Sequence, residues 1–173
     1  MNLEKYKNIF LDRDGIINSI VKRGTIISSP RNMQEFNLRD DFIKFSNNFS
    51  NKNISFFVCT NQPDIKRKLL ELDELKKMHS LIQKHLDIIE IAYCPHDDND
   101  DCRCRKPKPG LINKLISEYN LKREECIIIG DSKKDILAGK NAKIDTCLLE
   151  TDYNVETKCS KRIHSLQELK LYY

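Results

Sequence analysis

Short runs of apolar residues, each bounded by polar residues, recur along the 173-residue chain. Their length and their β-branched or aromatic content are typical of buried strands. The runs lie at residues 8–12, 54–60, 89–94, 126–130 and 146–150. Between them, apolar residues recur at helical spacing, which predicts helices at 39–52, 73–89, 109–120 and 132–142. Strands that alternate with helices predict an α/β fold, with helices on both faces of a mainly parallel sheet.

Polar residues close several of the predicted strands. Asp12 ends the first strand, Thr60 and Asn61 end the second, and Asp131 follows the run at 126–130. In a parallel sheet of this kind, ligands bind beyond the carboxyl ends of the strands. We therefore expect these four residues to meet in one crevice, which is the candidate site.

Composition and charge restrict the class of protein. No repeat or low-complexity linker divides the chain, which predicts a single domain over residues 1–173. No apolar run approaches the roughly 18 residues of a membrane span, and the N-terminal segment lacks the pattern of a secretory signal. The net charge of +4 comes from 30 basic and 26 acidic residues that are well mixed. We therefore expect a cytoplasmic protein that acts on a small anionic molecule, without nucleic-acid or membrane partners.

The seven cysteines divide into groups, apart from Cys159, which has no evident role. Three lie in apolar runs and are expected to be buried as small hydrophobic residues: Cys59, Cys126 and Cys147. The other three lie near a histidine, in a loop at 94–104: Cys94, His96, Cys102 and Cys104. Three thiolates and one imidazole form a complete tetrahedral shell for a structural Zn²⁺ ion. A free thiol cluster is the alternative, since so short a loop would strain a Cys102–Cys104 disulfide. The acidic residues at 97–101 are expected to form a solvated loop.

Asp12 and Asp14 are two residues apart at the end of the first predicted strand. Positions i and i+2 of an extended chain face the same side, and two close carboxylates repel each other unless a cation relieves them. Mg²⁺ prefers such oxygen ligands. Taken alone, the pair is better accounted for by a polar turn after a strand. Asp131 and Asp135 alone would indicate only an N-capped helix.

The order of these motifs is more specific than each motif alone. FLDRDGIIN (10–18), FFVCTNQ (56–62), Lys106 and IIIGDSKKD (127–135) follow one another along the chain. In this order the sequence resembles the haloacid dehalogenase superfamily of phosphohydrolases, from about residue 8 to residue 150. The resemblance implies a three-layer α/β/α, Rossmann-like fold with a mainly parallel central sheet and no large cap domain.

The resemblance also implies roles for the candidate residues. Asp12 would be the nucleophile that forms an aspartyl-phosphate, and Asp14 the general acid and then the general base. Thr60 and Lys106 would neutralise the phosphoryl oxygens.

The same resemblance implies a Mg²⁺ ion as cofactor. It would be bound by Asp12, Asp131 and the backbone carbonyl of Asp14. Asp135 would orient this site without binding the ion.

DRDGIIN, TNQ and the zinc loop with RKPKPG resemble the branch that holds heptose bisphosphate phosphatases and histidinol-phosphate phosphatases. The Pro-Gly after RKPK favours a heptose bisphosphate as substrate. Residues 19–31 lack the family's usual Gly-Tyr-Val stretch, so histidinol phosphate or another glycan-pathway sugar phosphate stays an alternative. Four residues are expected to bind the sugar phosphate: Asn61, Gln62, Arg105 and Arg23. Arg105 is the first choice for a second phosphate, ahead of Arg23, Lys22 and Arg31. We expect a monomer.

Two other classes of protein compete with a phosphatase. A phospho-accepting receiver domain is also α/β and uses Asp, Thr and Lys, but it would lack the zinc loop and the paired carboxylates. A zinc knuckle that binds nucleic acid would need interleaved aromatic residues and a strongly basic face, which this chain lacks.

Overall fold

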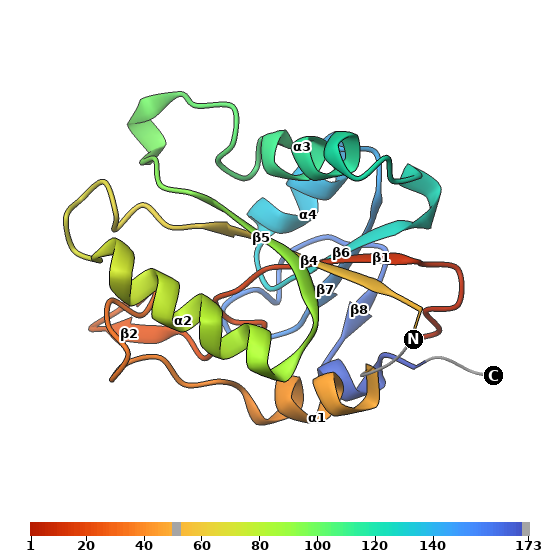
Figure 1. The fold of residues 1–173 in the computed structure, drawn as a ribbon, viewed down its shortest axis with the longest axis horizontal. Coiled ribbons are helices and arrows are strands. Elements are labelled where there is room, and N and C mark those ends of the chain that lie inside the picture. Colours follow the sequence, from red (N-terminus) through yellow and green to blue (C-terminus); the bar gives the residue numbers. More distant parts are fainter. Residues whose placement is uncertain (50–52, 171–173) are drawn as a thin grey trace.

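A six-stranded parallel sheet forms the centre of the computed structural model, which describes residues 1–49 and 53–170. The strand order is β5-β4-β1-β6-β7-β8, and every neighbouring pair is parallel (Figure 1). The strands are β1 (Asn8–Leu11), β4 (Ser55–Asn61), β5 (Ile88–Cys94), β6 (Cys126–Gly130), β7 (Asp145–Leu149) and β8 (Arg162–Ile163). The five predicted runs are all strands of this sheet.

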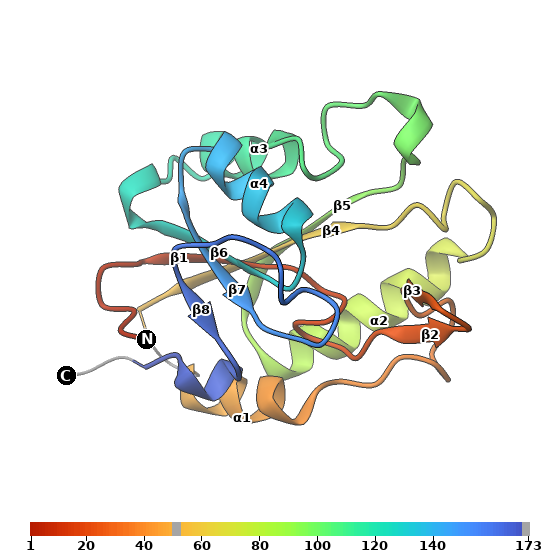
Figure 2. The same cartoon turned by 180° about the vertical axis from the view of Figure 1, so that it is seen from behind.

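Helices cover both faces of the sheet, as the alternation of elements predicts. One face carries α1 (Asp40–Phe49) and α2 (Leu72–His85), and the other carries α3 (Gly110–Glu118) and α4 (Lys133–Asn141) (Figures 1 and 2). Short 3₁₀ turns complete the helices: η1 (Asp98–Asp100), η2 (Arg123–Glu125) and η3 (Leu166–Glu168). The three-layer α/β/α architecture is therefore confirmed.

The central strand β1 shows how the sequence builds two cores. Its four residues are all buried, and successive side chains point to opposite faces of a strand. Ile9 and Leu11 belong to the cluster under α1 and α2, whereas Phe10 belongs to the cluster under α3 and α4. Phe10 stacks on Phe57 of β4, with ring centroids 5.2 Å apart. A strand buried on both faces reads as a continuous apolar run, which is why the sequence reveals it.

Several boundaries differ from the prediction. α2 ends at His85, and the end of the predicted helix at 73–89 belongs to β5. Ile89, which fits the helical spacing, is 45% exposed on that strand. The last part of the predicted helix at 39–52 lies outside the described residues.

Three strands were not predicted. Residues between β1 and α1 form a hairpin of β2 (Val21–Arg23) and β3 (Ile26–Ser28), and β8 adds a two-residue edge strand. Within the described residues, the connection after β1 holds only this hairpin and α1, and the one after β4 holds only α2, so neither carries a large cap domain. None of the helices in the described part of the chain has the length and apolar content needed to span a bilayer.

Candidate active site

The carboxyl ends of β1, β4 and β6 meet at a cavity of about 350 Å³. The predicted residues Asp12, Asp14, Thr60, Asn61 and Asp131 all line it. Lys106, Arg105 and Asp135 also contribute, and the hairpin adds Ile27, Ser28 and Ser29. The parallel sheet therefore brings together the residues that the strand ends predicted.

Lys106 is the centre of the buried charges in this cavity. Its side chain is 2% exposed, and Nζ lies 2.8 Å from Oδ1 of Asp12 and 2.5 Å from Oδ1 of Asp135. The same Nζ donates to the carbonyl oxygen of Cys59 at 2.7 Å. The side-chain amide of Asn61 exchanges two 3.0 Å hydrogen bonds with the backbone of Lys106. Asn61 thus fixes the backbone that presents the lysine.

Three buried carboxylates surround this single ammonium group. Oxygens of Asp12, Asp131 and Asp135 lie within 4.8 Å of one another. Burial, and then the Asp135 carboxylate, raise the pKa of Asp12 well above its ordinary value. The same two causes raise the pKa of Asp131 to about 7. When all three carboxylates are ionised, three negative charges against one positive charge leave an excess of two, and this donor set fits a divalent cation such as Mg²⁺.

Asp14 lies in a different electrostatic environment. The side chain of Arg13, which is fully buried, donates to Oδ1 of Asp14 at 2.8 Å. Asn18 donates to Oδ1 at 2.9 Å, and Gln62 donates to Oδ2 at 2.7 Å. Burial alone would raise the pKa of Asp14, but Arg13 and these hydrogen bonds outweigh burial and lower it. Adjacent carboxylates in one cavity therefore have pKa values shifted in opposite directions, which is common where two carboxyl groups perform different tasks.

The Cys/His loop gathers at the end of β5. Ligand atoms of Cys94, His96, Cys102 and Cys104 lie within 4.8 Å of one another. Sulfur–sulfur distances of 3.0 to 3.6 Å and a 3.3 Å distance from His96 Nδ1 to Cys104 Sγ approximate the edges of one tetrahedron. No disulfide links these residues, since all seven cysteines are free. This arrangement is compatible with zinc.

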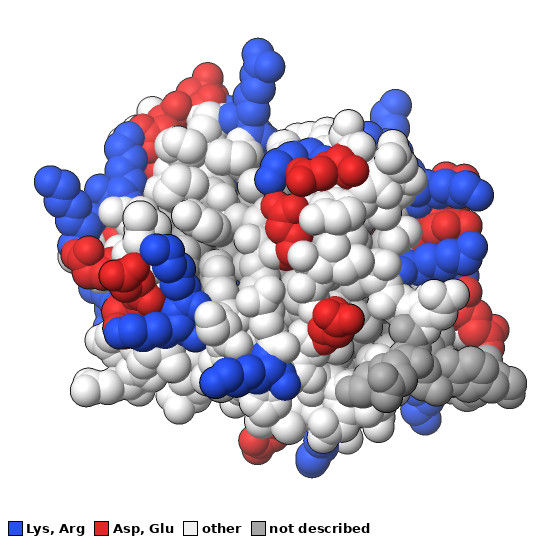
Figure 3. Space-filling view, in the orientation of Figure 1, with Lys and Arg blue, Asp and Glu red and all other residues white. Residues whose placement is uncertain are grey.

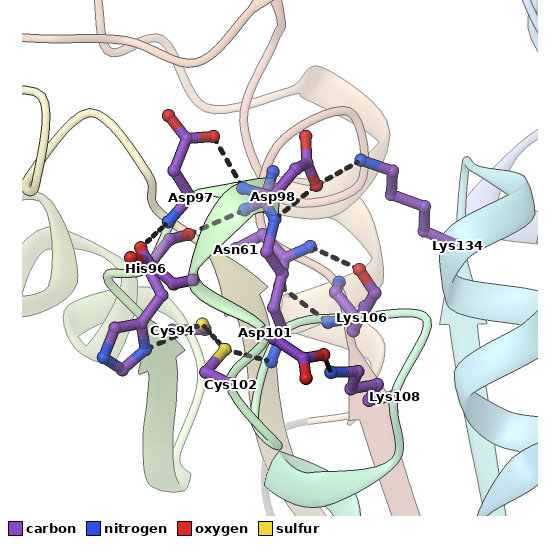
Figure 4. A network of polar contacts seen from close by, with 12 residues as sticks. Asn61, Cys94, His96, Asp97, Asp98, Asp101, Cys102, Lys106, Lys108 and Lys134 are labelled. Atoms are coloured by element: carbon purple, nitrogen blue, oxygen red, sulfur yellow. Dashed lines mark hydrogen bonds and ion pairs between the residues drawn. The ribbon is translucent and has the colours of Figure 1, made fainter.

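The acidic run inside this loop is solvated at Asp98 and Asp101, whose side chains are 64% and 95% exposed, but ion pairs also tie it to other segments. Asp97 caps the η1 turn, and each carboxylate of the run pairs with a basic residue. Figure 4 shows Asp98 with Lys134 and Asp101 with Lys108. The pairs are Arg67–Asp97, Arg105–Asp98, Lys66–Asp100 and Lys108–Asp101. The sequence alone could not reveal these ion pairs, because the basic partners of the acidic run come from separate segments of the chain.

The remaining substrate-binding candidates differ in their placement. Gln62 does not line the cavity, but its amide bridges Asp14 and Thr60, donating to Thr60 Oγ1 at 2.9 Å. Arg23 does not line it either, since its guanidinium pairs with Glu35 at 2.5 Å. Arg31 pairs with Asp64 at 2.7 Å. Of the predicted arginines, Arg105 is the one that the structure brings to the cavity.

Several residues in or beside the site were missed by the sequence analysis, including Asn18, which donates to Asp14, and Lys134, which lines the cavity. Arg13 and Ser29 both bind Asp14, the latter donating to Oδ2 at 2.9 Å. Tyr153 donates its hydroxyl to the Asp131 carboxylate, and Asn154 donates to the Asp131 carbonyl at 2.6 Å. The last two follow β7, so the strand-end rule could have found them had it been applied to that strand.

A family model for the haloacid dehalogenase-like hydrolases matches residues 30–149. The chain belongs to this family. This hydrolase is 32% identical over 170 residues to the D-glycero-alpha-D-manno-heptose-1,7-bisphosphate 7-phosphatase of Campylobacter jejuni, covering 95% of this chain and 94% of that protein. It is 34% identical over 137 residues to the D-glycero-beta-D-manno-heptose-1,7-bisphosphate 7-phosphatase of Neisseria meningitidis serogroup B, covering 76% and 71% of the two chains.

Solved structures of the family share the architecture. The D,D-heptose 1,7-bisphosphate phosphatase of B. bronchiseptica, complexed with magnesium and phosphate, superposes with a TM-score of 0.81 at 23% identity. The match covers 92% of this hydrolase and 93% of that chain. Family membership confirms the predicted class, a phosphatase of this superfamily, and excludes the receiver domain. Phosphatases of this family use Mg²⁺, in keeping with the excess of buried negative charge.

Proposed function

We propose that this chain is a Mg²⁺-dependent phosphatase that hydrolyses D-glycero-D-manno-heptose 1,7-bisphosphate to heptose 1-phosphate. The observation that carries the proposal is the buried cluster of Lys106 with the carboxylates of Asp12, Asp131 and Asp135. Relatives at 30–34% identity over most of the chain are named for this reaction, and their names include both the α and the β anomer. The sugar phosphate is thus inferred from relatives and the chemistry from the site.

Asp12 would attack the phosphorus atom and form an aspartyl-phosphate, which breaks the ester bond to the sugar oxygen. Its Oδ1 is held by Lys106 and by the backbone N–H of Arg13 at 2.7 Å, so the carboxylate orientation is fixed before substrate arrives. Lys106 and the Thr60 hydroxyl would neutralise the phosphoryl oxygens. Such prior orientation accounts for much of the catalysis in phosphoryl transfer.

Asp14 would donate a proton to the leaving sugar oxygen and then accept one from the water that hydrolyses the aspartyl-phosphate. Its lowered pKa in the free protein favours the ionised form, which suits the second step. A phosphate dianion beside it would favour protonation for the first step, because like charges disfavour ionisation. Gln62 and Ser29 hold the carboxyl group in place through both steps.

Asp12, Asp131 and the backbone carbonyl of Asp14 would hold the Mg²⁺ ion. When bound, it would supply positive charge that favours phosphoryl transfer. Asp135 is fully buried, caps α4 and pairs with Lys106, so we assign it to orienting the lysine.

A zinc ion held by Cys94, His96, Cys102 and Cys104 would be structural, since four protein ligands leave no open position. Arg105 and Lys106 follow Cys104 directly, so the ion would fix the loop that carries both cations.

The test is a phosphate-release screen with heptose 1,7-bisphosphate of each anomer, histidinol phosphate and hexose phosphates. We expect the highest kcat/KM with a heptose bisphosphate, loss of activity with EDTA, recovery with Mg²⁺, and no turnover by an Asp12→Asn variant. Preference for histidinol phosphate would overturn the substrate assignment. Normal turnover by Asp12→Asn would overturn the mechanism as well.

A further inference from the structure

Asp98, in the zinc loop, pairs with two basic residues through a single oxygen. Its Oδ1 lies 2.7 Å from Nε of Arg105 and 3.5 Å from Nζ of Lys134. Figure 4 shows Asp98 reaching across from the loop toward Lys134 on α4. The carboxylate is 64% exposed, whereas the Arg105 side chain is 10% exposed. An exposed acid thus occupies the point where two cations converge.

Both cations belong to the active-site cavity, but the acid does not. Arg105 and Lys134 line the cavity of about 350 Å³ together with Asp12 and Lys106. Asp98 instead lines a neighbouring depression of about 130 Å³. Arg105 directly precedes Lys106, and Lys134 directly precedes Asp135, while Lys106 and Asp135 are paired at 2.5 Å. The two cations therefore flank the reacting centre at its rim.

We propose that Arg105 and Lys134 together bind the second phosphate of a sugar bisphosphate, and that Asp98 occupies this subsite as an internal anion until the substrate displaces it. This inference rests on the proposed function, because it assigns the part of the substrate that does not react. It adds Lys134 and Asp98 to the residues that determine specificity.

Three features of the subsite support a displacement. A phosphate carries more charge and more acceptor oxygens than a carboxylate, so it binds a guanidinium and an ammonium group more strongly. Arg105 also donates through Nη1 to the carbonyl oxygen of His96 at 3.1 Å, which holds the guanidinium when the acid leaves. Asp98 lies on a short, exposed turn and can point into solvent.

The consequence is discrimination against monophosphates. A sugar with one phosphate cannot replace Asp98, so Arg105 and Lys134 contribute nothing to its binding. A bisphosphate gains the contacts of both cations, less the free energy of releasing Asp98. Asp98 therefore lowers the affinity for the true substrate slightly, while it keeps two cations satisfied in the free enzyme.

Steady-state kinetics with heptose 1,7-bisphosphate and heptose 7-phosphate test this inference. For Asp98→Asn we expect the KM for the bisphosphate to fall by about fivefold, the effect of one partly exposed ion pair. For Lys134→Gln we expect that KM to rise by about fivefold for the same reason. Neither change should alter the KM for the monophosphate. Asp101→Asn, in the same loop, and Lys133→Gln, next to Lys134, are the matched charge controls.

A higher KM of Asp98→Asn for the bisphosphate would show that the acid orients Arg105 rather than competing with substrate, and would overturn the inference. Equal changes for both substrates would overturn it too. Calorimetry with heptose 1,7-bisphosphate, comparing Asp12→Asn with Asp12→Asn/Asp98→Asn, needs no turnover. Failure of the wild type to hydrolyse the bisphosphate refutes the proposed function, whereas unchanged affinity of the double variant refutes this inference alone.

Discussion

Gly15 lies where the turn after β1 approaches the Asp131 carboxylate. Its φ angle is +87°, and an added Cβ would lie 1.8 Å from Oδ2 of Asp131. We expect Gly15→Ala to displace Asp131, to reduce kcat/KM by at least about tenfold and to lower the melting temperature. Gly24→Ala is the control, since its φ is +63° but its Cβ would meet nothing within 4 Å. Equal effects of the two changes would show that backbone strain alone is responsible.

Tyr153 is the residue whose role is least visible in the sequence. Its hydroxyl donates to Asp131, and removing a group that orients a metal ligand weakens metal binding by about tenfold or more. We expect Tyr153→Phe to raise by that factor the Mg²⁺ concentration for half-maximal activity, with little effect on KM. Tyr119→Phe, which removes a hydroxyl that donates to Glu90 outside the site, should change nothing. A Mg²⁺ titration in which both variants match the wild type would contradict this role.

Among single residues, the sequence predicted those at strand ends and missed those that support them. Asp12, Thr60 and Asp131 were found because a polar residue directly after a buried parallel strand lies at the sheet edge where ligands bind. Arg13 was missed because arginine is almost never fully buried unless it is paired, and its partners become visible only in three dimensions.

At the scale of elements, the loop from Cys94 to Lys106 links the Cys/His cluster to the lysine that the proposed mechanism places at the phosphoryl group. We expect Cys104→Ser to lose zinc, measured by mass spectrometry, and to unfold at a lower temperature, because metal binding contributes to folding. Phosphate release should fall as well, since Lys106 is positioned through Asn61 only while this loop is in place. Cys159→Ser, outside the cluster, should keep zinc, stability and activity. Full activity of a zinc-free Cys104→Ser protein would contradict this link.

The elements that were predicted are those with long apolar periodicity. Four of the five predicted strands are buried along nearly their whole length, so burial forces a recognisable pattern. The fifth, β5, is an edge strand that is only partly buried. β2, β3 and β8 have only two or three residues each, too few to show any period. The hairpin also exposes Ile26 and Ile27, at 67% and 43%, which no rule of burial would predict.

At the scale of the whole molecule, charged side chains of both signs are spread over the surface, and the sheet determines where unbalanced charge gathers. On the face seen in Figure 3, basic and acidic side chains lie next to each other around a broad uncharged area. The modest net charge of +4 therefore does not produce a single electrostatic field that would steer a charged partner to one face. Unbalanced charge is instead concentrated at the carboxyl end of the sheet, in the cluster of Asp12, Asp131 and Asp135.

This concentration makes the stability of the metal-free protein depend on pH. Burial and Asp135 raise the pKa of Asp131 to about 7, above its value in the unfolded chain. An acid whose pKa rises on folding destabilises the folded state when it is ionised, and the destabilisation is relieved as pH falls through the folded pKa. In EDTA, the Asp131 contribution should therefore raise the melting temperature as pH falls from about 8 to about 6.

His79 has the opposite effect on the pH dependence of stability, because burial lowers its pKa to about 4. A variant is therefore needed to separate the contribution of the Asp131 carboxylate. We expect Asp131→Asn to be more stable than the wild type in EDTA at about pH 8, with a difference that shrinks toward pH 6. The proposed Mg²⁺ site uses the ionised carboxylates, so a Mg²⁺ concentration of 100 times the dissociation constant at pH 8 should stabilise the wild type at that pH by about 2.7 kcal/mol. Since protons compete with the metal, that gain should be larger at pH 8 than at pH 6 and small in Asp131→Asn. Thermal melts in EDTA and in Mg²⁺ at both pH values test this, and a Mg²⁺ effect independent of pH and of Asp131 would place the ion elsewhere.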